Sequence, residues 1–348
     1  MISDIHIGVH KDSDTWHKIA LDFADWLKDE LHKNNIVDLV ICGDFFHTRH
    51  ELELSTLQCG AEFLRKLSDF NITITTGNHC CYYRDKSEVH SLDPFKEWSN
   101  IRVIDTVEYH QSHGKKLCFC PWGVDPHTLK GSDILFGHFA LVNFVMGPSK
   151  ICDHGVDSSD LLRNTQMVIT GHFHARQHRD YQGRQVLYLG SPMELDWGDR
   201  TADKGLTILN LETLDTVLIP NVVSPKHIKL VLSEIKEDLI SSSPRLKSLV
   251  SNNIIELEID KKAVPELIDL VMAKLSFFKP LQIRTKFNSP DVNFLSAGDM
   301  DMDMDIPDIN IEDAFKEYIN HMSLEASIKH EDLVVRVMEI HKTAASLV

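Results

Sequence analysis

Five short segments of the chain carry side chains that could bind metal ions. They are Ser3-Asp4-Ile5-His6, Gly43-Asp44-Phe45-Phe46-His47, Gly77-Asn78-His79, Gly137-His138-Phe139 and Gly171-His172-Phe173-His174. Four of them place Gly immediately before the first polar residue, which permits a sharp turn and a close backbone approach. One such segment alone is more often a turn than a ligand set. All five, however, follow predicted strands, and so many polar groups at one sheet edge are costly unless they form a site.

These side chains combine imidazole, carboxylate and amide donors, which suit Mn, Fe or Zn better than Mg or Ca alone. In an extended chain Asp4 and His6 project to the same side, as do His172 and His174, so each pair can serve one ion. The candidates exceed one tetrahedral set, which favours two ions that share a bridging carboxylate. Two cations would bind a phosphate group and lower the pKa of a water toward neutrality, which is the chemistry of phosphoester hydrolysis. A remaining histidine could act as general acid at the leaving oxygen.

The elements that must position these segments read as alternating strands and helices over residues 1–224. Apolar residues at helical spacing predict helices from Asp14 and over residues 54–67. Short apolar runs predict strands at 37–42, 72–76, 101–104, 117–120, 134–136 and 167–170, and strands alone follow at 186–189, 206–211 and 216–219. This order favours an α/β fold with a two-sheet β-sandwich core flanked by helices.

Two further regions follow residues 1–224. Pro220 and Pro225 bracket a linker, and residues 225–295 predict a small α+β domain of ββαβ order, with strands at 228–232, 254–259 and 281–287 and a helix at 264–275. The run 299–305 alternates Asp and Met, and its repelling charges favour an extended linker. Apolar residues at helical spacing return after residue 306. Residues 296–348 are therefore interpreted as an acidic linker followed by C-terminal helices.

The charge balance excludes non-specific wrapping of nucleic acid. The 348 residues include 52 acidic and 36 basic side chains, a formal net charge of −16, whereas such binding depends on Lys and Arg. An enzyme that meets phosphates through metal ions is not excluded, because bound cations invert the local sign of charge. No apolar run approaches the length of a membrane span, and the first residues lack the features of a secretory signal. The seven cysteines have no regular spacing, so reduced thiols and a cytoplasmic location are expected.

The five segments resemble the signatures of calcineurin-like metallophosphoesterases. Their details match the branch of SbcD-type DNA double-strand-break repair nucleases, which includes the recombination nuclease subunits of T-even-like bacteriophages, and the resemblance covers essentially the whole chain. It implies a two-metal DNA phosphodiesterase that acts as a double-strand exonuclease and single-strand endonuclease. It also implies a role in recombination and double-strand-break repair with an SMC-like ATPase subunit, in the bacterial cytoplasm if the chain is phage-encoded.

The resemblance assigns a role to each site residue. One ion, most simply Mn²⁺ with Mg²⁺ as the alternative, would be held by Asp4, His6, Asp44 and His174. The second would be held by Asp44, Asn78, His138 and His172, with Asp44 as the bridge. By the same resemblance, His79 is the general acid that protonates the departing 3′ oxygen, and His47 helps to hold the scissile phosphate.

The resemblance also implies partners. Residues 225–295 match a capping domain that selects DNA, with candidate phosphate contacts at Lys226, Lys229, Lys261, Lys262, Arg284 and Lys286. Helices within 52–98, at Leu54–Leu67 and Leu92–Trp98, match the region that pairs two subunits into a homodimer. The helices of 306–348 match the element that docks onto the coiled-coil base of the ATPase. The simpler alternatives are that both sets of helices pack on this chain.

Two departures from the family pattern affect the predicted activity and the first strand. Cys80 stands where the family motif has Asp, and a neutral thiol cannot accept hydrogen bonds as a carboxylate does, so reduced nuclease activity is predicted. Relatives have more residues before the first motif, so either the first strand is short or the numbered chain begins at an internal Met. Two other functions stay open. One is a metallophosphatase or cyclic-nucleotide phosphodiesterase, and the other is a DNA-docking subunit whose nuclease is weakened at Cys80.

Overall fold

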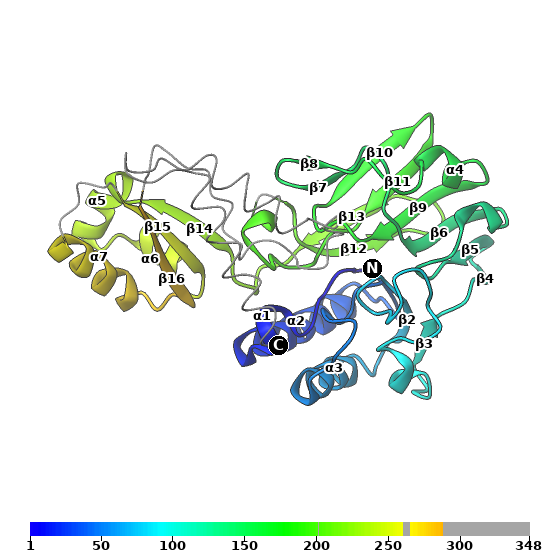
Figure 1. Cartoon of the computed structure of the whole chain (residues 1–348), viewed down its shortest axis with the longest axis horizontal. Coiled ribbons are helices and arrows are strands. Elements are labelled where there is room, and N and C mark those ends of the chain that lie inside the picture. Colours follow the sequence, from blue (N-terminus) through cyan, green and yellow to red (C-terminus); the bar gives the residue numbers. More distant parts are fainter. Residues whose placement is uncertain (201, 260–264, 288–348) are drawn as a thin grey trace, which may run out of the picture. The chain divides into compact units, whose positions relative to one another are not determined.

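The computed structural model describes residues 1–200, 202–259 and 265–287 (Figure 1). Its N-terminal part builds a parallel three-stranded sheet in the order β1-β2-β3, with strands β1 (Asp38–Cys42), β2 (Asn71–Thr75) and β3 (Ile101–Ile104). Helices α2 (Asp14–Lys33) and α3 (Leu54–Lys66) pack against each other. Their apolar faces share one core with the sheet, because Phe23, Leu27 and Phe63 are fully buried there.

The segment that contains the first motif runs beside this sheet. Isolated parallel bridges join Ile2 to Ile41 and Ile7 to Phe46. The short helix α1 (Val9–Asp12) follows, with left-handed backbone at His10. The first motif therefore lies next to the end of β1, joined to that part of the chain by two isolated bridges rather than by a regular strand.

A six-stranded mixed sheet forms the second layer. Its order is β10-β11-β9-β6-β5-β4, with bounds β4 (Glu108–Ser112), β5 (Lys115–Phe119), β6 (Ser132–His138), β9 (Thr165–Gly171), β10 (Gln177–Tyr181) and β11 (Arg184–Tyr188). The four central strands are parallel, and the two edge strands are antiparallel to their neighbours. One apolar cluster joins Cys42 and Ile104 of the first sheet to Phe136 and Ile169 of the second. The predicted α/β architecture with two facing sheets is thus confirmed.

Smaller elements complete this part of the chain. They are the 3-10 helices η1 (Asp93–Phe95), η2 (Pro126–Thr128) and η3 (Trp197–Asp199), the hairpin β7 (Val145–Gly147) and β8 (Lys150–Ile151), helix α4 (Ser158–Leu162), and the pair β12 (Gly205–Leu209) and β13 (Thr216–Pro220). Within 52–98 the predicted helix over 54–67 is present as α3, whereas residues 92–98 contain only the single 3-10 turn η1.

The described C-terminal part has its own sheet and core. Strands β14 (His227–Val231), β15 (Ile254–Ile259) and β16 (Gln282–Phe287) are all parallel. In the sequence, helices α5 (Leu232–Ser241) and α6 (Pro244–Val250) connect the first two strands, and α7 (Pro265–Phe277) connects the last two. The predicted ββαβ order is therefore wrong, since parallel neighbours need a crossover and α5 and α6 supply it. Buried Leu232, Ile235 and Leu239 line the inner face of α5.

Several predictions fall outside the described residues. These are the end of the capping region at 288–295, the acidic linker at 299–305, the helices of 306–348, and the phosphate contacts Lys261 and Lys262. Among the helices that the structure describes, none is both long and apolar enough to cross a membrane.

Candidate metal centre

Every residue of the five motifs lies at the carboxyl end of a strand or beside it. Asp44 follows β1, Asn78 follows β2, His138 is the last residue of β6, and His172 follows β9. Strands β6 and β9 are in register, with His138 opposite Gly171. Because the carboxyl ends of parallel strands meet at one edge of a sheet, the two layers bring these side chains together.

The first motif is fixed in this edge by backbone hydrogen bonds. The backbone N–H of Asp4 donates to the Gly43 carbonyl at 3.2 Å, and that of His6 donates to the Asp44 carbonyl at 3.0 Å. The two Asp4 carboxylate oxygens in turn accept from the backbone N–H of His172 at 3.0 and 3.2 Å. The first and last motifs are thereby tied to each other and to the second.

The backbone at the site is strained. Asp4, His6, Asp44 and His172 all have positive φ, at 53°, 52°, 46° and 95°. Non-glycine residues rarely adopt this conformation, which costs on the order of 1–3 kcal/mol each and persists only where the surroundings enforce it. A Cβ atom at Gly77 would overlap the Asp44 carboxylate, so glycine is required for the second and third motifs to approach.

Three buried or half-buried side chains form a first cluster. Ligand atoms of Asp4, His6 and His174 all lie within 4.8 Å of one another. The two Nε2 atoms of His6 and His174 are 3.2 Å apart, and His6 Nε2 lies 3.7 Å from Oδ2 of Asp44. The structure thus brings together the four residues predicted for one ion.

A second cluster lies on the other side of Asp44. Ligand atoms of Asp44, His138 and His172 are also within 4.8 Å of one another, and Asp44 Oδ2 is 3.1 Å from His138 Nε2. The Asn78 amide oxygen lies 3.0 Å from His138 Nε2 and 3.0 Å from His172 Nδ1. Asp44 Oδ2 therefore contacts both clusters, which is the position that a bridging carboxylate needs.

His47 and His79 stand beside the first cluster. Their rings stack with centroids 5.6 Å apart, and both group with His6 in a third set of neighbouring ligand atoms. His79 Nδ1 lies 2.5 Å from the His47 carbonyl oxygen, which can only accept, so Nδ1 carries the proton of this hydrogen bond. The backbone N–H of His79 donates to Asp44 Oδ1 at 2.9 Å, which fixes this residue relative to the metal clusters.

Charge at the centre is divided between carboxylates and imidazoles. Burial alone would raise the pKa of Asp44, but the imidazoles of His138, His79 and His6 hold it well below its usual range. Burial alone would lower the pKa of His138, but the Asp44 carboxylate raises it to about 9. Burial, with a smaller contribution from Asp44, raises the pKa of Asp4. One carboxylate is thus kept ionised and close to several imidazoles.

The other imidazoles of the centre also differ in whether they are neutral or protonated. Burial and the neighbouring imidazole of His79 lower the pKa of His6 well below its usual value, and burial with His138 does the same for His172. These two rings are neutral and can offer lone pairs at neutral pH. Burial opposes protonation of His174, but Asp199 raises the pKa of that imidazole to about 9.

The donor set fits divalent metal ions. Imidazole nitrogens, carboxylate oxygens and one amide oxygen converge in two adjoining groups, and these donors suit Mn²⁺, Fe²⁺ or Zn²⁺. Metal coordination requires neutral histidines and ionised carboxylates. His6, His172 and Asp44 already have these protonation states at neutral pH, whereas His138 and His174 would have to release a proton. Among the described residues no cysteine belongs to these groups, and all seven cysteines are buried free thiols.

Cys80 lies beside this centre without contributing a ligand. It is fully buried in the core of the first sheet and helices, and burial followed by the nearby Asp44 raises its pKa to about 12. The thiol is therefore neutral at physiological pH. Cys118 and Cys120 are buried in a second apolar cluster.

Sequence reasoning missed Asp199 and Lys204. Asp199 Oδ2 lies 3.5 Å from His174 Nδ1, and Asp199 Oδ1 lies 3.1 Å from Lys204 Nζ. Both side chains are buried. The only signal in the sequence is a pair of acidic residues, Asp196 and Asp199, on either side of Trp197-Gly198.

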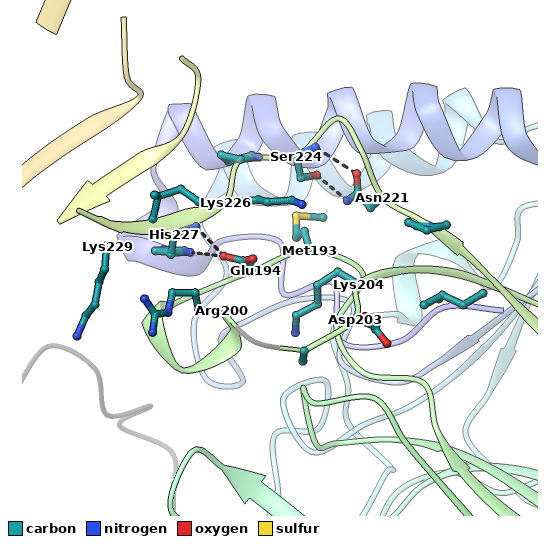
Figure 2. Close-up of a pocket in the computed structure, with 15 residues that line it drawn as sticks. Met193, Glu194, Arg200, Asp203, Lys204, Asn221, Ser224, Lys226, His227 and Lys229 are labelled. Carbon is teal, nitrogen blue, oxygen red and sulfur yellow. Dashed lines mark hydrogen bonds and ion pairs between the residues drawn. The ribbon is translucent and has the colours of Figure 1, made fainter. Parts of the chain in front are cut away.

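A separate pocket lies near this ion pair. It has a volume of about 570 Å³ and is lined by Lys204, Glu194 and His227 among others (Figure 2). The residues of the two metal clusters do not line this pocket. Glu194 Oε2 accepts from the His227 backbone N–H at 2.6 Å and lies 3.3 Å from Nδ1 of that residue.

The candidate phosphate contacts differ in their surroundings. Lys229 and Arg284 both form ion pairs with Glu256, at 3.4 and 2.7 Å. Lys226 and Lys286 are exposed. The first two are thus engaged within the sheet, and the last two face solvent.

Comparison with known proteins agrees with the resemblance drawn from the motifs. No protein-family model matches the chain. Over 231 residues the chain is 27% identical to exonuclease subunit 1 of Enterobacteria phage T4, and the match covers 63% of this chain and 66% of the phage protein. Similar solved structures include an archaeal phosphodiesterase (TM-score 0.35, 15% identity, 63% of this chain and 97% of the other). Another is the phosphopantetheinyl hydrolase of Mycobacterium tuberculosis (TM-score 0.34, 13% identity, 55% of this chain and 88% of the other).

The sequence match spans just under two thirds of the phage protein's length. It confirms the predicted resemblance to the nuclease subunits of T-even-like phages, and the motifs that suggested it converge in space at the ends of the sheets. The chain is a homologue of exonuclease subunit 1 of phage T4.

Proposed function

We propose that this chain is a metal-dependent DNA nuclease. The observation that carries the proposal is the pair of buried clusters that share Asp44 Oδ2, at 3.7 Å from His6 and 3.1 Å from His138. Two adjoining ligand sets around one carboxylate suit two-metal hydrolysis of a phosphodiester. The similarity to an exonuclease subunit supports DNA as the substrate.

The ligand roles follow the two clusters. One ion would be held by Asp4, His6, Asp44 and His174, and the other by Asp44, Asn78, His138 and His172. Two divalent cations, most simply Mn²⁺, would supply positive charge to the phosphate oxygens and lower the pKa of a water toward neutrality. The strained backbone at Asp4 and Asp44 holds the carboxylates in place before substrate binds.

His79 and His47 act on the phosphodiester from the side of the first cluster. His79 is the general acid for the departing 3′ oxygen, and the proton that it gives would be the one on Nε2. Its Nδ1 hydrogen bond to the His47 carbonyl and the stacked His47 ring hold the imidazole in place for this role. His47 Nδ1 lies 3.2 Å from His6 Nδ1, which places it next to the metal ligands where a scissile phosphate would be held.

The domain division and the partners belong to the same proposal. Residues 1–224 form the nuclease domain, residues 225–295 cap it and select DNA, and residues 296–348 hold the linker and the helices that bind an SMC-like ATPase. Exposed Lys226 and Lys286 are the better candidates for phosphate contacts, because Lys229 and Arg284 are paired with Glu256. A homodimer would form through α3 and the η1 region.

The decisive experiment is cleavage of end-labelled duplex DNA and circular single-stranded DNA with Mn²⁺. Wild type is compared with His79→Ala, Asp44→Ala and the control His178→Ala, which changes an exposed histidine outside the clusters. We expect loss of cleavage by 10²-fold or more in the first two variants, roughly the contribution of a general acid, and none in the control. Equal cleavage by all four proteins would refute the proposed site.

A second candidate function rests on Cys80. Its neutral, buried thiol replaces the acceptor that a carboxylate would provide beside Asp44. A chain that binds DNA and two ions but cleaves neither substrate at any Mn²⁺ concentration would be a docking subunit rather than a nuclease.

A further inference from the structure

His174 uses its two ring nitrogens for different neighbours. Nε2 points into the first metal cluster, 3.2 Å from His6 Nε2. Nδ1 lies 3.5 Å from the buried Asp199 Oδ2, within ion-pair distance. A metal-binding imidazole whose other nitrogen faces a carboxylate has a fixed tautomer and a more basic ligand nitrogen.

Asp199 is itself held in one orientation. Its Oδ2 also accepts from the backbone N–H of Leu195 at 3.0 Å, and its Oδ1 is paired with Lys204 Nζ at 3.1 Å. The carboxylate also lies at the end of η3, where Asp196 Oδ1 accepts from the Asp199 backbone N–H at 3.1 Å. The carboxylate therefore cannot turn away from His174 without losing these partners.

Lys204 connects this carboxylate to the backbone of the last motif. Its Nζ donates to the His174 carbonyl at 2.8 Å and to Ser191 Oγ at 2.6 Å, in addition to its ion pair with Asp199. The three N–H groups of the ammonium thus have three acceptors. One lysine fixes both the main chain of His174 and the group that faces its ring.

We propose that Asp199 is a positioning residue that orients His174 toward a metal ion, with Lys204 holding Asp199 for this task. An ion pair that served only folding would be complete with Lys204 at Oδ1 and the Leu195 N–H at Oδ2, yet Oδ2 also lies within ion-pair distance of a ring nitrogen of the cluster. The inference rests on the proposed metal centre, and it extends that centre by two residues outside the five motifs.

The test measures metal binding rather than cleavage. Mn²⁺ affinity is determined by calorimetry for wild type, Asp199→Asn, Lys204→Met and the control Asp196→Asn. The control makes the same chemical change on the same turn, and an asparagine oxygen can still accept from the N–H groups of Gly198 and Asp199. The His174 Nδ1 proton is observed by NMR in the Zn²⁺-loaded proteins, with its resonance assigned through His174→Gln.

We expect Asp199→Asn to weaken one of two Mn²⁺ sites 10–100-fold and to remove the downfield, slowly exchanging Nδ1 proton, while Asp196→Asn changes neither. Lys204→Met should weaken the same site severalfold, and it decides the question if Asp199→Asn does not fold. Unchanged Mn²⁺ affinity and an unchanged proton resonance in the Asp199 and Lys204 variants would overturn the positioning role alone. A wild-type chain that binds no Mn²⁺ would overturn the proposed metal centre together with it.

Discussion

The Nε2 atoms of His6 and His174 lie 3.2 Å apart, although the two residues are separated by 168 positions in the sequence. Two nitrogen atoms at this distance cannot both act as donors. The backbone N–H of His6 donates to the Asp44 carbonyl, and the other ring nitrogen of His174 faces Asp199. This arrangement of the two rings is most favourable when both nitrogens direct their lone pairs at one cation.

Metal stoichiometry follows from this arrangement. His6→Gln should reduce the number of tightly bound Mn²⁺ ions from two to one, because it removes a ligand of the first cluster and leaves Asp44, His138 and His172 in place. Asp44→Asn should weaken both sites, since its Oδ2 contacts both clusters. Calorimetric titration with Mn²⁺ measures both numbers. Loss of a single site in Asp44→Asn would contradict the bridging position.

The pH dependence of metal binding has a defined sign. Burial by itself would lower the pKa of His138 and of His174. In the metal-free protein Asp44 raises the pKa of His138 to about 9, and Asp199 raises that of His174 to about 9. Each ion must therefore displace a proton at neutral pH, so the apparent Mn²⁺ affinity of each site should rise by about tenfold per pH unit between pH 6 and 8 and level off near pH 9. Titrations in two buffers of different ionisation enthalpy count the protons released. Affinity that does not change over this range would contradict the assignment of these two ligands.

Close backbone packing makes the last motif sensitive to a single methyl group. A Cβ at Gly171 would overlap Ser3 Oγ and lie 2.8 Å from Asp4 Oδ2, so Gly171→Ala should destabilise the metal-free protein by about 1–3 kcal/mol and weaken Mn²⁺ binding. Gly147→Ala is the matched control, because nothing lies within 4 Å of its Cβ position. Urea unfolding measures the stability of both variants. Equal stability of the two would show that the motifs pack less tightly than described.

Cys80→Asp tests the departure from the family pattern. The backbone of Gly77 and Phe45 favours the charged form at position 80 in part, so a carboxylate there can accept hydrogen bonds that a neutral thiol cannot. We expect Mn²⁺-dependent cleavage to rise by up to roughly 10–100-fold, the range for groups that support metal ligands, at some cost in thermal stability from the nearby Asp44. Cys80→Ser, which stays neutral, should cleave at the wild-type rate. An unchanged rate in Cys80→Asp would remove Cys80 as a cause of weak activity.

The nine residues predicted for the site could be recognised in the sequence because each stands in a short motif, and seven of them lie at or after the end of a strand, whereas Asp4 and His6 lie between two isolated bridges. Local signals suffice there, since a strand ends, a glycine or left-handed residue turns the chain, and the polar side chain reaches the sheet edge. Asp199 could not be found in this way. Its role depends on a contact with His174 that only the folded loop creates.

Some strands and helices of the structure are not predicted from the sequence, and there are physical reasons for this. Strands β4 and β10 are edge strands with mostly exposed or half-buried residues, so they lack the apolar alternation that marks a strand. Helices α5 and α6 are short, and α6 has only two buried residues, although Leu232, Ile235 and Leu239 of α5 do stand at helical spacing. Such segments are stabilised by packing against their neighbours in the fold, which their own sequence pattern does not indicate.

The order of the motifs along the chain also sets when the candidate metal centre can form. A ribosome that adds about 5–20 residues per second synthesises His174 roughly 8–34 s after His6, and neither cluster is complete before β9 and the residues that follow it have been made. The first two motifs therefore leave the ribosome well before their partners. The centre can assemble only once the strand that carries the last motif is available to pair with β6.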